Sequence, residues 1–336
     1  MRRPVSARRI ATLVAILAIA AAAAGCSGGS MATRALAPLP GGLALKVRSS
    51  TPVNGLPISL TLVRPGSMGV IYVPPGGHVY SLTYWSRGQR AQGYLTVPAG
   101  PKPHALFIYL HGGYYIAEPG HTDDDYWTRQ EAIVNAQARA VAFLPNYVGY
   151  GPSGGKVGDA YQDTQDVANG LKALARIRGL RLERNATYLL GFSLGGAIGV
   201  LLAEHDPQVH AAALDSPWPG ARMSLSWYQT NYFHLNRDER LGYKILTRYE
   251  GSNTASRWYR RNSYDCQDVH MPLLIVGGTQ DDIVPQAMLT TMAADLKDCG
   301  QNVEFKLFPG GHSPYGGDEQ ALIQDWFLRH GISLQL

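Results

Sequence analysis

The chain has 336 residues and a formal net charge of +5 at pH 7, and four of its arginines precede residue 10 in a segment without acidic residues. Without that segment the net charge is +1 (+5 − 4), which does not indicate a nucleic-acid-binding protein. Roughly 290 residues follow the N-terminal segments, enough for one large α/β domain. No internal repeat is evident.

The first 25 residues have the pattern of a secretory signal peptide, with arginines, the apolar run 11–24 and then small residues before Cys26. Ala23-Ala24-Gly25-Cys26 resembles a bacterial lipobox, which implies lipidation of Cys26 and a protein anchored at the extracytoplasmic face of a membrane. An ordinary signal peptide is the alternative, and the run is shorter than the ~20 residues of a membrane-spanning helix. Residues 26–50 are expected to be the lipidated cysteine and a flexible tether, because the stretch up to Gly42 is rich in Ala, Pro and Gly.

The remaining residues, 51–336, are predicted to alternate strands and helices. Residues 79–85 and 92–97 alternate apolar and polar side chains on either side of Arg87-Gly88-Gln89, which predicts a hairpin. Ala105 to Leu110 is continuously apolar, as expected of a strand buried on both faces. The pattern predicts an α/β fold, a doubly wound and mostly parallel sheet with its binding crevice at the carboxyl ends of the strands. Further strands are predicted at 140–144, 187–190, 211–214, 272–276 and 303–308, and helices at 127–138, 159–177, 194–205, 286–296 and 319–328.

A candidate nucleophile lies where the strand 187–190 meets Gly191-Phe192-Ser193-Leu194-Gly195-Gly196 and continues as an apolar helix. A sharp strand-to-helix turn exposes a serine hydroxyl, and the flanking glycines relieve the crowding. A chance match is the alternative in a chain with 38 glycines, but the position between a strand and a helix favours a nucleophile elbow. Ser193 is therefore the predicted nucleophile, with the N–H of Leu194 as a donor to the oxyanion.

A serine nucleophile needs a base to accept its proton and an acid to orient that base. After the elbow, Asp281 follows the strand 272–276 and His312 follows the strand 303–308, which completes the order Ser, Asp, His. Asp215, at the end of the strand 211–214, is the alternative acid. Asp282 is expected to cap the helix that follows it.

These residues resemble the α/β-hydrolase superfamily, in which G-x-x-D-x-x-V-P supplies the acid and a Gly-His loop supplies the base. The resemblance implies Asp281 as the acid, four residues before Pro285, and His312 as the base. His111-Gly112-Gly113 resembles the oxyanion element, which implies the N–H of Gly113 as the second donor, with Tyr114 as the alternative.

The resemblance runs from about residue 105 to the C-terminus, and 109–115, 145–151 and 191–196 look most like the catalytic domains of prolyl oligopeptidases and acyl-peptide hydrolases. Val148 stands where those relatives usually carry Arg. The residues before the hydrolase core are also too few for the blades of ~40–45 residues that build a peptide-gating β-propeller.

Between the strand ending at 214 and that starting at 272, residues 216–268 are expected to form a helical cap, since so long a loop without secondary structure is unusual. The cap is rich in aromatics, which either line an acyl pocket or pack it onto the core. Residues 216–265 hold eight Lys or Arg against four Asp or Glu, and this basic character indicates either contact with an anionic membrane or an ordinary solvated surface. Cys266 and Cys299 are expected to form a disulfide in an exported chain.

The sequence thus predicts a serine hydrolase that cleaves carboxylic esters through an acyl-enzyme. A peptidase for short or acylated peptides is the close alternative, and a catalytically silent surface protein is a third. No metal or organic cofactor is implied. A dehalogenase is disfavoured because it needs Asp where Ser193 stands, and a dehydrogenase because no G-x-G-x-x-G follows the first strand.

Overall fold

The structure is a computed structural model that describes residues 39–46, 50–64, 76–100, 103–113, 139–206, 208–312 and 316–334. The signal segment, Cys26, Tyr114 and the predicted helix 127–138 lie outside these residues.

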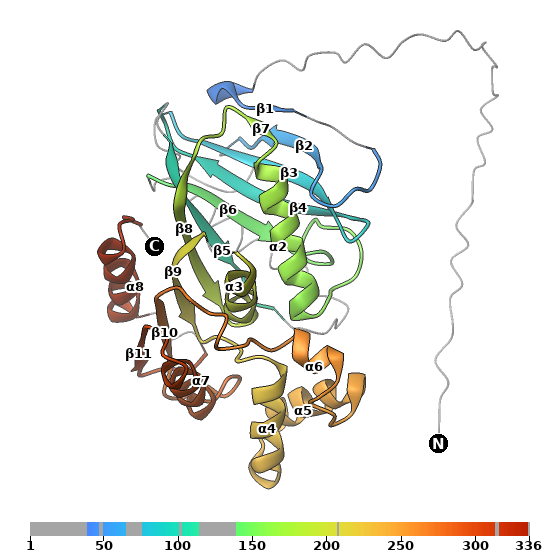
Figure 1. The fold of residues 1–336 in the computed structure, drawn as a ribbon, viewed down its shortest axis with the longest axis vertical. Coiled ribbons are helices and arrows are strands. Elements are labelled where there is room, and N and C mark those ends of the chain that lie inside the picture. The colour runs from blue at the N-terminus through green and yellow to red at the C-terminus, as the bar shows by residue number, and fades with distance from the viewer. Residues whose placement is uncertain are drawn as a thin grey trace, which may run out of the picture. The chain divides into compact units, whose positions relative to one another are not determined.

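A nine-stranded sheet with the order β11-β10-β9-β8-β5-β6-β4-β3-β2 forms the centre of the domain (Figure 1). The strands from β11 to β6 pair in parallel, and β4, β3 and β2 extend the sheet in antiparallel fashion from β6. The prediction of an α/β fold with a mostly parallel, doubly wound sheet is therefore confirmed. The strands are β2 (Pro57–Leu62), β3 (His78–Ser86), β4 (Gln89–Val97), β5 (His104–Leu110), β6 (Val141–Asn146), β8 (Leu182–Phe192), β9 (Val209–Asp215), β10 (Leu273–Gly278) and β11 (Val303–Phe308).

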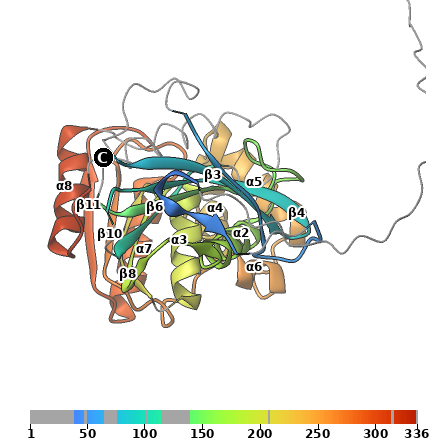
Figure 2. The ribbon, with the colours of Figure 1, turned by 90° about the horizontal axis from the view of Figure 1, so that it is seen from above.

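Helices cover both faces of the sheet because its central strands are apolar on both sides. In β5, Ile108 and Leu110 pack into the cluster that includes α2, α3 and α7, whereas Phe107 and Tyr109 point to the other face, where α8 packs. Figure 2 shows α8 alongside the β10–β11 end of the sheet. The helices are α2 (Ala160–Leu174), α3 (Leu194–His205), α7 (Gln286–Asp298) and α8 (Gly317–Arg329).

The hairpin predicted around Arg87-Gly88-Gln89 is formed by β3 and β4, which pair in antiparallel register. Both Arg87 (φ 50°) and Gly88 (φ 71°) adopt left-handed backbone conformations, as a two-residue hairpin turn requires. The side chain of Arg87 turns back onto α2 and contacts Asp166, with Nε and Nη2 donating to its carboxylate at 3.0 and 2.9 Å. The hairpin is thus tied to the helix that covers it.

The expectation of a flexible tether is wrong for the last part of residues 26–50. Residues 44–45 form the strand β1 (Ala44–Leu45), which pairs with β7 (Ile177–Arg178), and a short 3-10 helix η1 (Pro40–Gly42) precedes it. Leu43 is only 1% exposed. The buried Leu43, the pairing of β1 with β7 and the hydrogen bond from the Lys46 N–H to the Arg176 carbonyl attach this segment to the domain, although its composition resembles that of a linker.

The cap follows β9 and precedes β10 in the chain, and its helices pack together (Figure 1). It comprises α4 (Ala221–Thr230), η3 (Tyr232–His234), α5 (Arg237–Glu250) and α6 (Arg257–Arg261). Asn236 caps α5 in a capping box with Glu239. The Asn236 amide also donates to the carbonyl of Asp282 at 3.1 Å, so the cap touches the loop that carries the predicted acid. Several of the cap aromatics pack inward, as expected if they hold the cap onto the core: Trp218, Tyr228, Trp258 and Tyr259 are buried.

Candidate active site

Ser193 lies in the turn between β8 and α3, with φ 53° and ψ −115°. This left-handed conformation is strained for a residue with a side chain, and backbone hydrogen bonds hold it, including one from the Gly196 N–H to the Ser193 carbonyl at 3.0 Å. The Ser193 N–H donates to Asp215 and the Ser193 carbonyl accepts from Trp218, each at 2.9 Å. A Cβ on Gly195 would stand 1.9 Å from the carbonyl oxygen of Leu110, so only glycine fits where α3 meets the end of β5.

The loop after β5 lies directly beside Ser193. A Cβ on Gly112 would be 3.3 Å from the Ser193 Cβ and 2.8 Å from the Phe192 ring. Among the residues that the structure describes, no acceptor takes the backbone N–H of Gly113 or of Leu194. Both predicted oxyanion donors are therefore available near the serine, Leu194 as the first residue of a helix whose N-terminus favours negative charge.

Stacked aromatic rings pack against the loop after β5. The ring of His111 stacks on that of Tyr147, with centroids 4.2 Å apart, and the Tyr147 hydroxyl donates to the His111 carbonyl at 3.0 Å. The Tyr150 ring lies against Gly113. Sequence reasoning assigned no role to these tyrosines, although their place in the loop after β6, at the carboxyl edge of the sheet, was a signal.

Asp281 and His312 are joined by a hydrogen bond of 2.8 Å between the Asp281 Oδ2 and the His312 Nδ1. The other oxygen of Asp281 accepts the N–H groups of Ile283 and Val284 at 2.9 and 2.8 Å. The His312 ring packs against Phe192, the neighbour of Ser193, with centroids 5.1 Å apart. The fold thus brings the three predicted residues to one edge of the sheet, from the ends of β8, β10 and β11.

Asp215, the alternative acid, and Asp282, the expected helix cap, have different roles from those of Asp281. Asp215 lies at the end of β9, where its carbonyl accepts the Ser193 N–H, and the described contacts of His312 involve Asp281 instead. The expectation that Asp282 caps the following helix is wrong, since α7 begins after Pro285 without a side-chain cap. The turn before that helix is closed by Asp281 itself.

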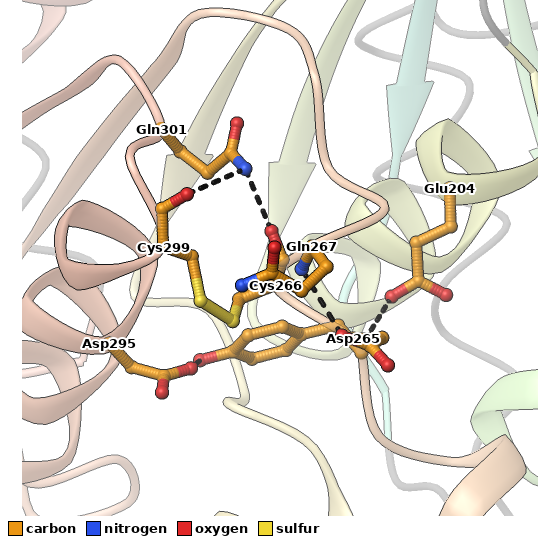
Figure 3. Close-up of a disulfide and its surroundings, with 8 residues drawn as sticks. Glu204, Asp265, Cys266, Gln267, Asp295, Cys299 and Gln301 are labelled. Atoms are coloured by element: carbon orange, nitrogen blue, oxygen red, sulfur yellow. Dashed lines mark hydrogen bonds between the residues drawn. A yellow bond between two sulfur atoms is a disulfide. The ribbon is translucent and has the colours of Figure 1, made fainter.

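Cys266 and Cys299 form a disulfide, with 5.9 Å between their Cα atoms, that joins the end of the cap to the end of α7 (Figure 3). Beside it, the N–H of Asp265 donates to the Glu204 carboxylate at 2.6 Å. Burial, with the nearby charges of Asp268 and Asp265 also contributing, raises the pKa of Glu204 to about 7.

A cavity of about 550 Å³ lies between the cap and α7. Its walls include Met223 and Trp227 of α4, Met288 of α7 and Cys266 of the disulfide. Neither Ser193 nor His312 lines it, so the residue geometry at the strand ends, rather than this cavity, marks the candidate active site. In the described ranges there is no cluster of three His, Cys, Asp or Glu side chains suited to a metal ion, and no helix long and apolar enough to cross a bilayer.

The model of the prolyl oligopeptidase family matches residues 152–331, more than half of the chain. The chain belongs to the prolyl oligopeptidase family. The match begins before the elbow and includes Ser193, Asp281 and His312. The family supports a serine hydrolase, and it leaves the choice between esters and peptides open.

Proteins similar to this chain carry both kinds of name. An uncharacterized peptidase of Bacillus subtilis, YtmA, is 26% identical over 237 residues, which cover 68% of this chain and 84% of the relative. An acylaminoacyl peptidase of Pyrococcus horikoshii has a TM-score of 0.55 at 18% identity, covering 74% of this chain, but this chain spans only 41% of that protein's length. An acetyl xylan esterase from Paenibacillus sp. R4 has a TM-score of 0.56 at 18% identity, covering 80% of this chain and 88% of the esterase. At these identities the solved structures show a shared fold.

Proposed function

We propose that this family member is an esterase that cleaves carboxylic esters with Ser193, His312 and Asp281 as its catalytic triad. The observation that supports the proposal most directly is the hydrogen bond between Asp281 and His312, whose ring packs against Phe192, the residue before the serine of the strained elbow. The buried carboxylate fixes the tautomer of His312, since Nδ1 must carry the proton that Asp281 accepts.

In the proposed reaction the Ser193 hydroxyl attacks the acyl carbon while the Nε2 of His312 accepts its proton. The N–H groups of Leu194 and Gly113 bind the oxyanion, and His312 returns the proton to the departing alcohol. A water molecule then attacks the acyl-enzyme by the reverse sequence, which releases the acid and restores the serine. Each oxyanion donor lowers the barrier by about 3 kcal/mol in enzymes of this kind.

Two observations favour an ester over a peptide substrate. The acetyl xylan esterase aligns over 88% of its length, whereas the acylaminoacyl peptidase aligns over 41%. Val148, at the position where peptidase relatives usually carry arginine, is 1% exposed and directs its backbone N–H to Asp166, so it offers no charge to a peptide. The second candidate is a peptidase for short or acylated peptides, which the family match and the name of the Bacillus subtilis relative favour.

The test is to label the purified chain with a fluorophosphonate probe beside Ser193→Ala, and then to compare nitrophenyl esters of increasing acyl length with aminoacyl anilides. Labelling of the wild type that disappears in the variant, with faster turnover of esters, is expected. Faster turnover of anilides would replace the esterase with the peptidase. A folded wild type that takes no label would instead support a catalytically silent binding protein.

We also propose that the protein is exported and anchored by lipid on Cys26. The lipobox-like sequence before that residue supports an anchor, and the disulfide between Cys266 and Cys299 supports an oxidising compartment. Metabolic labelling with a clickable fatty acid should mark the wild type and fail to mark Cys26→Ala. Equal labelling of the two would rule out the lipid anchor.

A further inference from the structure

Exposed apolar side chains concentrate around the start of α5. Among the described residues, the large apolar side chains with the greatest exposure include Phe233, which is 88% exposed, and Tyr232, Leu241 and Ile283, each 43% exposed. Tyr232 packs on Tyr243 of α5, and Ile283 follows Asp282, which Asn236 contacts. We call Tyr232, Phe233, Leu241 and Ile283 the apolar rim.

Four cations form a stripe along the same helix. Positions 237, 240, 241, 244 and 248 recur every three to four residues and therefore share one face of α5. All five side chains are exposed, and four of them are basic: Arg237, Arg240, Lys244 and Arg248. We call these four residues the basic stripe, and Leu241 of the apolar rim lies within it.

The cations of the basic stripe are not paired with acidic side chains of the described fold. Among the described side chains, none of its four cations takes part in a salt bridge, and their one side-chain hydrogen bond runs from the Nε of Arg240 to the carbonyl of Leu235. On α6, Arg261 differs, because it pairs with Asp159 at 2.8 Å and lies over the ring of Tyr161, whereas Arg257 and Arg260 are also exposed. The four exposed cations of α5 therefore stand out because they share one helix face with Leu241 and lie next to the exposed side chains of Tyr232 and Phe233.

We propose that the basic stripe and the apolar rim dock the cap onto an anionic phospholipid membrane surface. Cations on a helix attract acidic headgroups, while exposed aromatic and leucine side chains enter the boundary between headgroups and acyl chains. A soluble polyanion would be bound by the stripe and would give no role to Phe233, whose exposed ring the membrane explains. Docking through α5 places the membrane next to the loop of Asp281, since Asn236 joins the two.

The experiment measures partition of the chain from Ser27 onward, which retains every described element, onto vesicles of phosphatidylcholine with and without a quarter of phosphatidylglycerol. Binding to the anionic vesicles at about 0.1 M salt should exceed binding to the neutral ones at least tenfold, and it should weaken as salt screens the charges. Changing the four cations of the stripe to Gln should weaken it about a hundredfold. Phe233→Ser should weaken it about tenfold without any change in charge.

The matched control neutralises four other exposed cations to Gln: Arg178, Arg184, Lys297 and Lys306. The control should bind anionic vesicles within about twofold of the wild type, because its charge change is the same and only its location differs. Turnover of a soluble ester by all variants reports folding, and repeating the partition with Ser193→Ala separates docking from catalysis. Equal losses of vesicle binding in the stripe and control variants would overturn the proposal. It would also be overturned if the chain bound heparin and the Phe233→Ser variant kept the wild-type affinity for vesicles.

Discussion

Two buried carboxylates in different parts of the molecule differ in the hydrogen-bond donors that surround them. The side chains of Asp281 and Asp163 are both 0% exposed. Asp281 accepts two backbone N–H groups and contacts His312 at 2.8 Å. Asp163, on α2, has Arg87 at 3.7 Å, and neither of its oxygens accepts a well-formed hydrogen bond from a described residue.

Burial without partners disfavours the charged form of a carboxylate, and burial together with the charge of Asp166 raises the pKa of Asp163 well above its ordinary value. Asp166, one turn along α2, takes the better donors of the cluster: Arg87, the backbone of Val148 and the Ser86 hydroxyl. Hydrogen-bond donors therefore surround the carboxylates of Asp281 and Asp166 but not that of Asp163. The candidate active site supplies them and the site at Asp163 does not, so substitutions at the two sites should have opposite consequences.

The largest effect is expected from Asp281→Asn. The amide oxygen still accepts the N–H groups of the turn, so the melting temperature should change by only a few degrees, whereas kcat should fall about 10⁴-fold because the imidazolium loses its counter-charge and its tautomer. Ester turnover and thermal unfolding measure the two quantities. A variant that keeps wild-type kcat would return the role of the acid to Asp215.

Arg87→Met should come next, because it leaves Asp163 and Asp166 buried without their shared cation. Breaking such a buried pair costs about 3–5 kcal/mol of unfolding free energy, measurable by urea titration. The loss should be larger at pH 8 than at pH 5, because Arg87 lowers the pKa of Asp163 and its removal makes ionisation of that buried carboxyl more costly. Arg87→Lys keeps the charge and should lose less, and equal losses in the two variants would contradict an electrostatic cause.

Asp163→Asn should stabilise the protein at neutral and alkaline pH. The folded state holds a proton on Asp163 that the unfolded chain releases above its ordinary pKa, so this group makes stability fall as pH rises until the raised pKa is passed. The neutral amide removes that loss, and the melting temperature at pH 8 should rise by about 2–4 °C with kcat unchanged. A lower melting temperature at pH 8 would show that the charged form is stabilised in the fold.

Glu204→Gln should change stability least. Glu204 is intermediate between Asp281 and Asp163 in its hydrogen bonding, since it has one backbone donor, the N–H of Asp265. Its pKa of about 7 in the folded state lies above its ordinary value of 4.5, so it lowers stability as pH rises between these values. The amide oxygen keeps the bond to Asp265, and a gain of about 2 °C or less in melting temperature at pH 8 is expected, with none at pH 4. An equal gain at both pH values would point to packing rather than to charge.

The sequence predicted one of these regions and not the other. Ser193, Asp281 and His312 each follow a strand within a short pattern, so local sequence carries their positions. The contact between Arg87 and Asp166 joins residues 79 positions apart, and nothing in the helical spacing of α2 separates its buried acids from exposed ones. The prediction of a flexible tether was wrong just before Ala44 for a related reason, because the burial of Leu43 depends on a surface formed by distant residues.

The close approach of Gly195 to the carbonyl of Leu110 has a consequence for altering this protein by directed evolution. The nucleophile and the oxyanion loop share one tightly interlocked junction, in which a methyl group at position 195 has no space. Acid and base are carried by two further loops, and the loop of the acid contacts the cap through Asn236. A saturation library should therefore return almost only the parent residue at position 195, while new substrate preferences should arise from changes in the cap.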